Sequence, residues 1–78
     1  MCWALKVQGL DTVTGGEIEE VLNGKVNVIV HLFSGRLRPR GCVTATKAIV
    51  SAIDHDPANY FVNIHTVKHP AGAIRSQL

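Results

Sequence analysis

The segments YFVNIHT (residues 60–66) and HPAGAIRSQL (residues 69–78) decide the fold of this chain. The first segment is dense in β-branched and aromatic residues, which favour a pleated and half-buried strand. Phe61, Asn63 and His65 share one face of that strand, and the alternate residues share the other. A proline and a glycine then interrupt the chain before an apolar rhythm resumes. The pattern predicts a hairpin of two β-strands.

The length of 78 residues allows one small domain over residues 1–78. Apolar residues make up 46% and charged residues 18%, which is typical of a globular rather than a disordered chain. A domain of this size buries only about 60% of its unfolded surface, so we expect marginal stability without further support. The formal net charge of +2 is too small to indicate a polyanion partner by itself.

No segment has the features of a membrane span or a signal peptide. The longest apolar run, residues 26–33, contains Asn27 and His31 and is far shorter than the ~18 residues that a spanning helix needs. The start of the chain lacks a basic region, a long apolar core and a small-residue cleavage site. These observations predict either a cytoplasmic chain or one whose own N-terminus has been lost.

Cys2 and Cys42 are the only cysteines. Two isolated thiols are compatible with one disulfide, but they are more often unpaired, small apolar residues. We therefore expect free thiols at both positions, with a disulfide as the alternative.

The first half of the chain contains three predicted strands. Residues 2–9 alternate between apolar and polar side chains, which indicates a strand with one buried face. Residues 16–22 fit a short strand better than a single helical turn, because an Asn-Gly pair at residues 23–24 separates them from a clear strand at residues 25–33. Asn-Gly between two strands is a strong hairpin signal, since both residues tolerate the positive φ of a type I′ turn.

The middle of the chain predicts a loop and a short helix. Residues 34–41 contain glycine, proline and three arginines, which indicates an exposed loop, and residues 42–43 form at most a short strand. Thr44 or Thr46 caps a short helix whose apolar residues form one stripe. Pro57 ends it, because the residue before a proline is disfavoured in the helical region. Antiparallel hairpins joined by one helical crossover predict a mainly β fold, a sandwich or open barrel with one short helix.

Four histidines, at positions 31, 55, 65 and 69, are the candidate metal ligands. His31 and His65 lie in the middle of predicted strands, so they can meet across a sheet. No histidine shows the short local spacing of a zinc or copper site, and the cysteines lie far apart. We therefore predict no metal site and no cofactor. We expect His31 and His65 to be half-buried and hydrogen-bonded to the backbone.

Acidic side chains cluster in two places. Glu17, Glu19 and Glu20 are candidates for general acid–base chemistry, but like charges on one strand face disfavour burial, so we expect a solvated edge. Residues 54–56, Asp-His-Asp, offer oxygen ligands for a cation, but a solvated helix end before a proline explains them more simply. The sequence contains no glycine-framed serine, no cysteine–histidine pair with a third member and no phosphate-binding loop, so it predicts no catalytic residue.

Arg36, Arg38 and Arg40 form the only basic cluster. Three guanidinium groups on one loop suit phosphate binding, but no aromatic residue is interleaved and the overall charge is weak. A solvated loop is therefore our expectation, and weak nucleic-acid binding through this loop is the alternative. On the closing hairpin, we expect Asn63 and Arg75 to satisfy loop carbonyls and so hold the turns together.

The closing hairpin resembles the C-terminal signature of the CHRD (chordin) domain family, which reads roughly Tyr-Val-Asn-Val-His-Thr and then Asn-Pro-x-Gly-Glu-Ile-Arg-Gly-Gln-Leu. The residues that keep its order and spacing here are Val62, Asn63, His65, Thr66, Pro70, Gly72, Ile74, Arg75, Gln77 and Leu78. The segments 5–10, 13–16, 23–33, 43–45 and 49–53 also fit the family. The resemblance therefore spans nearly the whole chain.

Three departures from the family pattern matter. The family's His-x-His motif is Glu17-Ile18-Glu19 here, and the glutamate and second glycine of the closing motif are Ala73 and Ser76. The family's opening strands, which usually carry a Glu-Val-Pro-Pro-like segment, have no counterpart. The resemblance therefore implies the C-terminal portion of a CHRD domain, truncated at its N-terminus.

The resemblance implies an immunoglobulin-like antiparallel β-sandwich, similar to the Cu/Zn superoxide dismutase barrel and here incomplete, usually in secreted or cell-surface proteins. It implies no established enzymatic activity. We expect structural roles for the signature residues Asn63, His65, Thr66, Pro70, Gly72, Ile74, Arg75 and Gln77. The enzymatic alternative is a superoxide-dismutase-like metal site at His31, His65 and His69, which the loss of the His-x-His motif disfavours.

Absent opening strands would leave a sheet edge and part of the core uncovered. Such an edge is a template for another strand, so we predict a protein partner or a homo-oligomer at that edge. In chordins these domains accompany modules that bind growth factors of the bone morphogenetic protein type. We do not extend that partner to a small chain on its own.

Overall fold

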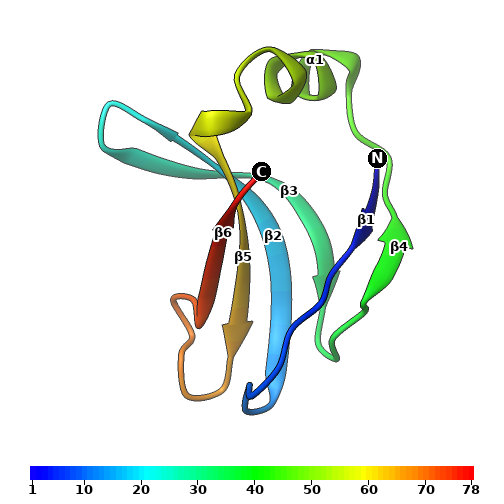
Figure 1. The fold of residues 1–78 in the computed structure, drawn as a ribbon, viewed down its shortest axis with the longest axis vertical. Coiled ribbons are helices and arrows are strands. Elements are labelled where there is room, and N and C mark those ends of the chain that lie inside the picture. Colours follow the sequence, from blue (N-terminus) through cyan, green and yellow to red (C-terminus); the bar gives the residue numbers. More distant parts are fainter.

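Two antiparallel sheets and one short helix make up the computed structural model, which describes residues 1–78 (Figure 1). The elements are β1 (Cys2–Ala4), β2 (Val13–Leu22), β3 (Lys25–Ser34), β4 (Arg40–Cys42), α1 (Lys47–His55), a single 3₁₀ turn η1 (Pro57–Asn59), β5 (Tyr60–Thr66) and β6 (Ile74–Gln77). The larger sheet has the order β3-β2-β5-β6, and the smaller sheet pairs β1 with β4. This arrangement confirms the predicted mainly β sandwich with one short helix.

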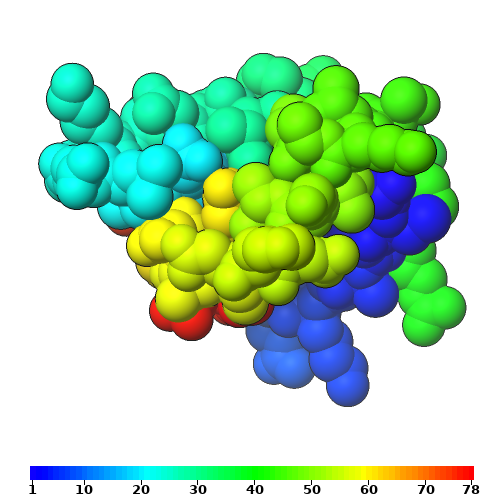
Figure 2. All heavy atoms as spheres, turned by 90° about the horizontal axis from the view of Figure 1, so that it is seen from above, coloured from blue at the N-terminus to red at the C-terminus, as the bar shows by residue number.

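The hairpin of β2 and β3 forms as the sequence predicts, although β2 starts three residues earlier than expected. Asn23 and Gly24 turn the chain with φ angles of 51° and 76°, the two positive values that a type I′ turn requires. Figure 2 shows the tip of this hairpin, in cyan, projecting at one side of the molecule. The ladder between the two strands shifts register twice, between Gly16 and Glu17 and between Ile18 and Glu19, so β3 is an irregular edge strand.

The closing hairpin of β5 and β6 is also confirmed. β5 lies between β2 and β6, which places Asn63 opposite Glu17 on one side and opposite Arg75 on the other. Ile64 and Thr66, on the inner face of β5, are fully buried. The outer face carries Phe61, Asn63 and His65, as the alternation predicts.

The core lies on the inner face of the larger sheet. Its buried residues are Ile18, Val30, Leu32, Phe33 and Tyr60. The smaller sheet covers it through Trp3, whose ring stacks against Phe33 with a centroid distance of 6.3 Å. Helix α1 closes one end of the sandwich, seen from above in Figure 2, and packs Ile49 and Ile53 on the core.

Helix α1 begins and ends where its capping residues predict. Of the two threonines considered, Thr46 is the N-cap, and its hydroxyl accepts a hydrogen bond of 3.2 Å from the Ile49 N–H. The helix stops at His55, and Asp56 and Pro57 continue as an exposed turn. The predicted solvated helix end at residues 54–56 is therefore confirmed.

The first strand is shorter than its alternating sequence predicts. β1 ends at Ala4, because its partner β4 contains only three residues and Pro39 precedes it. Leu5 donates the last cross-strand hydrogen bond, to the Pro39 carbonyl. The side chains nevertheless keep alternating as far as Gln8, with Leu5 and Val7 half-buried and the residues between them exposed.

The two cysteines form a disulfide, so the expectation of free thiols is wrong. Cys2 and Cys42 are directly opposite each other in the β1–β4 pair, with their Cα atoms 4.0 Å apart. They are 40 residues apart in the sequence, and only the pairing of the two short strands brings them together. Both cysteines lie on the exposed face of the smaller sheet.

Candidate functional site

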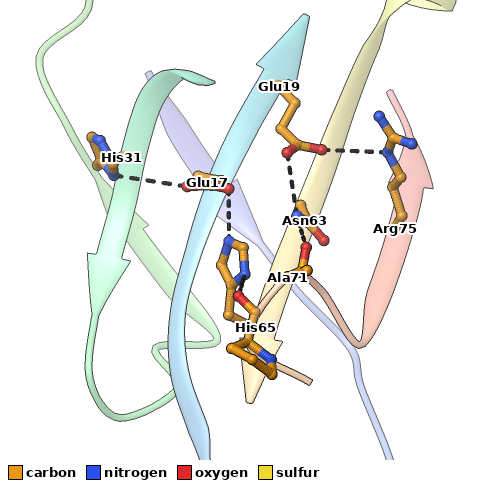
Figure 3. Close-up of polar contacts among 8 residues, drawn as sticks. Glu17, Glu19, His31, Asn63, His65, Ala71 and Arg75 are labelled. Atoms are coloured by element: carbon orange, nitrogen blue, oxygen red, sulfur yellow. Dashed lines mark hydrogen bonds and ion pairs between the residues drawn. The ribbon is translucent and has the colours of Figure 1, made fainter. Parts of the chain in front are cut away.

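The outer face of the larger sheet carries a cluster of buried acids, which corrects the expectation of a solvated edge. Glu17 and Glu19 are only 8% and 7% exposed. They lie on β2, a central strand, so side chains from both neighbouring strands surround them (Figure 3). The loop after β5 also folds against this face through Ala71. Two carboxylates can be buried side by side here because each has its own cationic or amide partners.

Glu17 lies between two histidines. Its Oε1 atom is 2.6 Å from Nε2 of His65, and its Oε2 atom is 3.9 Å from Nδ1 of His31 (Figure 3). The His31 side chain is 83% exposed, because it stands on the edge strand β3, so the expectation that it is half-buried is wrong. His65 is half-buried as expected, and its Nδ1 lies 2.7 Å from the Pro70 carbonyl.

The surroundings of His65 favour its protonated form. Both partners of its ring, the Glu17 carboxylate and the Pro70 carbonyl, accept hydrogen bonds, and only the imidazolium donates from both nitrogens. Burial of the ring lowers the pKa of His65, but the hydrogen bonds to Glu17 and Pro70 outweigh it and the pKa is raised. His65 and Glu17 therefore form an ion pair that bridges β5 and β2.

Glu19 lies between an amide and a guanidinium group. It accepts from Asn63 Nδ2 at 3.3 Å, and its other oxygen is 3.3 Å from Arg75 Nε. Asn63 Nδ2 also donates to the Ala71 carbonyl, at 3.2 Å, which is the loop contact that the sequence predicts. Arg75 makes no such loop contact, since β6 places it beside Glu19 with its guanidinium 5.0 Å from the centre of the Phe61 ring.

The other signature residues build the turn between β5 and β6. The His69 N–H donates to the hydroxyl of Thr66, and Ile74 lies opposite Ile64 in the strand pair. Gly72 has a φ of 137°, and a Cβ there would lie 2.3 Å from the Asn63 side-chain oxygen, so only glycine fits. Gln77 is exposed on β6.

Asp11 ties this turn to the start of β2. Its carboxylate accepts a hydrogen bond of 2.9 Å from the Lys68 N–H. Hydrogen bonds from the Thr66 hydroxyl and from Lys68 lower the pKa of Asp11.

The four histidines do not converge. His31 and His65 flank Glu17, His55 lies on α1 with its Nδ1 3.0 Å from the Ser51 carbonyl, and His69 belongs to the turn after β5. No three histidine, cysteine, aspartate or glutamate side chains meet in an arrangement that could hold a metal ion. The structure thus does not bring together the alternative metal ligands His31, His65 and His69.

An open apolar groove borders the inner face of the sandwich. It consists of two adjoining hollows of about 490 and 370 Å³, which share Ala4, Leu5, Val62 and Leu78. One wall is the N-terminal strand, and the other is formed by β5, β6 and the end of the chain. Asp54, on α1, is the only charged residue that lines the larger hollow. Leu78 lines both hollows and is 42% exposed.

The N-terminal wall of this groove has an unpaired backbone. In an antiparallel pair, alternate residues direct their N–H and C=O groups away from the partner, so Cys2 and Ala4 present theirs at the free edge of β1. None of residues 6–11 forms a backbone–backbone hydrogen bond. Residues 4–7 all line the smaller hollow, so the free edge runs directly along the groove.

The basic cluster remains exposed. Arg36, Arg38 and Arg40 are solvent-accessible and form no ion pair. Arg40 belongs to β4, opposite Ala4 of β1, and the Arg38 carbonyl accepts a hydrogen bond of 2.8 Å from the Trp3 indole. The predicted exposed loop is confirmed for residues 35–39, beside the smaller sheet, but the short strand β4 begins at Arg40 and not at Cys42 as predicted.

Sequence reasoning missed the groove as a site. Its lining comes from residues 1–7, from single residues of β2 and β3, from the helix α1 and from the closing hairpin, and no local pattern connects these segments. The sequence contained one signal. The alternating pattern at residues 2–9 continues beyond Leu5, whereas the partner strand cannot extend beyond Pro39, so the residues after Leu5 have no strand to pair with.

Comparison with known proteins gives one match. The family model of the CHRD domain matches residues 1–78. No curated protein and no solved structure gives a significant match. None of the helices has the length and apolar character needed to cross a membrane.

Proposed function

Because this chain belongs to the CHRD domain family over residues 1–78, we propose that it is a non-enzymatic module that binds proteins. It takes up a β-strand, from a protein partner or from a second copy, along the free edge of β1 and its continuation. A strand added there extends the smaller sheet and closes the groove. This mode of recognition combines main-chain hydrogen bonds with pockets for alternate side chains.

The observation that carries this proposal is the unpaired backbone of Cys2, Ala4 and Lys6, which lies along an apolar groove. Exposed backbone groups of an extended segment are a template for another strand. The inner faces of β5 and β6 next to it hold Val62, Ile74 and Leu78 without full cover. A strand on this edge would therefore satisfy the backbone and bury the apolar residues in one step.

A binding role also fits the chemistry of the outer face. Glu17 and Glu19 are tied to partners on β5 and β6, and these contacts join the strands of the larger sheet. Their arrangement supports a structural use, since each carboxylate already accepts from a cation or an amide. The groove is the hollow whose lining is mostly apolar.

The disulfide supports an oxidising compartment for this module. Disulfides persist in secreted and cell-surface proteins and are rare in the reducing cytosol. The bond between Cys2 and Cys42 holds the strand that forms the groove wall. We infer that the chain acts outside the cytosol, as the family resemblance implies.

A proline on the free edge tests the proposal. Ala4→Pro removes an N–H that points away from β4, so it blocks strand addition and leaves the β1–β4 hydrogen bonds in place. Ala4→Thr is the matched control, because it keeps the N–H and favours a strand. Light scattering at high micromolar concentration measures self-association, and the emission of Trp3, the only tryptophan, reports strand peptides in the groove.

We expect association or peptide binding by the wild-type chain and by Ala4→Thr, with at least a tenfold loss in Ala4→Pro, about 1.4 kcal/mol. A thermal melt of each variant shows whether the fold is kept. A folded wild-type chain that stays monomeric and binds no strand peptide of any composition would refute the proposed function.

A further inference from the structure

The exposed face of the smaller sheet carries positive charges that have no partner. Lys6 and Arg40 are exposed and form neither an ion pair nor a side-chain hydrogen bond within the chain. Arg40 is paired with Ala4, so their side chains share one face, and Lys6 lies on that face two residues further along. The three ion pairs of the chain all lie on the outer face of the other sheet, so no acid serves Lys6 or Arg40.

A strand added to β1 would lie next to these charges. Neighbouring strands are roughly 4.8 Å apart, so the added strand would be beside Lys6 and about 10 Å from β4. Ala4 is small, which leaves the long Arg40 side chain free to reach across it. The side chains of the added strand alternate, so those on one face enter the groove and those on the other meet Lys6 and Arg40.

We propose that the partner is an acidic β-strand of another protein, with apolar residues facing the groove and carboxylates facing Lys6 and Arg40. This inference rests on the proposed function and specifies its partner. Opposite charges on neighbouring strands stabilise pairing, and like charges oppose it. Pairing of two copies through their β1 edges would instead bring two sets of Lys6 and Arg40 together.

The two ends of the groove differ in charge. Asp54 is the only acid that lines it, and it lies with Met1 and Val50 in the hollow at the α1 end. Lys6 lines the other hollow, away from α1. Asp54 therefore disfavours an acid among the side chains that face the groove, and Lys6 favours carboxylates at the other end of the added strand.

Three blocked peptides of about seven residues, a typical strand length, test this inference. Valine alternates with glutamate in the first, with glutamine in the second and with lysine in the third. Binding is followed by Trp3 emission at low salt and again at ~1 M salt, where the screening length falls to about 3 Å. The variant Lys6→Glu/Arg40→Glu reverses the two charges, and Lys25→Glu/Lys47→Glu is the control with the same change in net charge at two other exposed lysines.

The glutamate peptide is expected to bind about threefold to tenfold more tightly than the glutamine peptide at low salt, since exposed ion pairs are individually weak. This preference for the glutamate peptide should vanish at high salt. Lys6→Glu/Arg40→Glu should instead bind the lysine peptide most tightly, and the control variant should keep the preference for the glutamate peptide. Equal binding of all three peptides, or a preference that the control also loses, overturns the acidic partner while the strand-binding module stands. Self-association that outcompetes every peptide would assign the groove to a second copy, and a failure of all peptides to bind would refute the proposed function itself.

Discussion

The two faces of the larger sheet differ in polarity and in how far they are covered. The polar outer face is shielded from solvent by its own side chains, whereas the apolar inner face is partly open. The outer face carries Glu17, Glu19, His65 and Arg75, yet its acids are buried by their own partners on adjacent strands. The inner face is apolar, yet a groove leaves part of it open beside β5 and β6. A polar face thus needs no covering layer when its charged side chains pair across the strands. An apolar face needs a covering layer, and here the smaller sheet and α1 cover the inner face only in part.

The largest expected effect comes from opening the inner face. Removing the disulfide in Cys2→Ala/Cys42→Ala frees a loop closed over a separation of 40 residues, which corresponds to about 4 kcal/mol in the loop-entropy estimate. Because β1 and β4 are only three residues long, the groove wall should detach and the whole domain should lose most of its stability. Urea unfolding of the wild-type chain with and without a reductant measures this loss.

The double alanine variant provides the control for the reductant. Its unfolding curve should be the same with and without reductant, and it should match the curve of the reduced wild-type chain. A wild-type chain whose midpoint did not move on reduction would show that the smaller sheet holds the groove wall without the disulfide.

The next largest effect tests the closed outer face. Glu17→Ala removes the acceptor for His65, so a half-buried imidazolium loses its partner. Hydrogen bonds to charged groups contribute about 1.5–3 kcal/mol, so we expect a loss near 2 kcal/mol. Glu17→Gln keeps an acceptor oxygen and should lose less. If both variants unfolded at the wild-type urea concentration, the outer face would owe its closure to something other than this pair.

The pH dependence of stability distinguishes the two faces further. The pKa of folded His65 is raised above its ordinary value of 6.5, so its contribution is complete below pH 6.5 and disappears as the pH rises through the folded value. Stability should therefore decline from pH 6 towards neutral and weakly alkaline pH. The same series of thermal melts on His65→Gln should show a flatter profile. An unchanged profile in that variant would exclude His65 as the titrating group.

The smallest effect belongs to the open side of the groove. Leu78→Ala truncates a side chain that is 42% exposed, so we expect a loss of less than about 1 kcal/mol. Ile64→Ala, on the same face but 1% exposed, should lose about 2–5 kcal/mol. Chemical denaturation of the two variants compares the covered and the uncovered parts of one face. Equal losses would mean that the groove is filled in solution.

The sequence predicted the elements whose causes are local. The Asn23-Gly24 turn, the Thr46 cap and the alternation of β5 all depend on residues close together in the chain, and each was found where expected. The hairpin pattern predicted a sandwich or an open barrel, and the family signature favoured the sandwich. The burial of Glu17 escaped prediction, because its partner His65 is 48 residues away and only the register of β2 with β5 brings the two together. The disulfide escaped for the same reason, since Cys2 meets Cys42 through strand pairing alone.

Under the proposed function, the irregular ladder of β3 limits the number of partners that we expect one domain to hold. Two register shifts bend this long edge strand, and bulges of that kind prevent a second strand from pairing along it. The opposite edge strand, β6, has four residues and carries an exposed arginine, which also discourages pairing. β4, the other edge of the smaller sheet, has three residues and also carries an exposed arginine, Arg40. The β1 edge is the one that its unpaired continuation lengthens and that borders the groove, so under the proposed function we expect each domain to accept one strand. A complex of this kind would have a one-to-one stoichiometry and would not grow into fibrils.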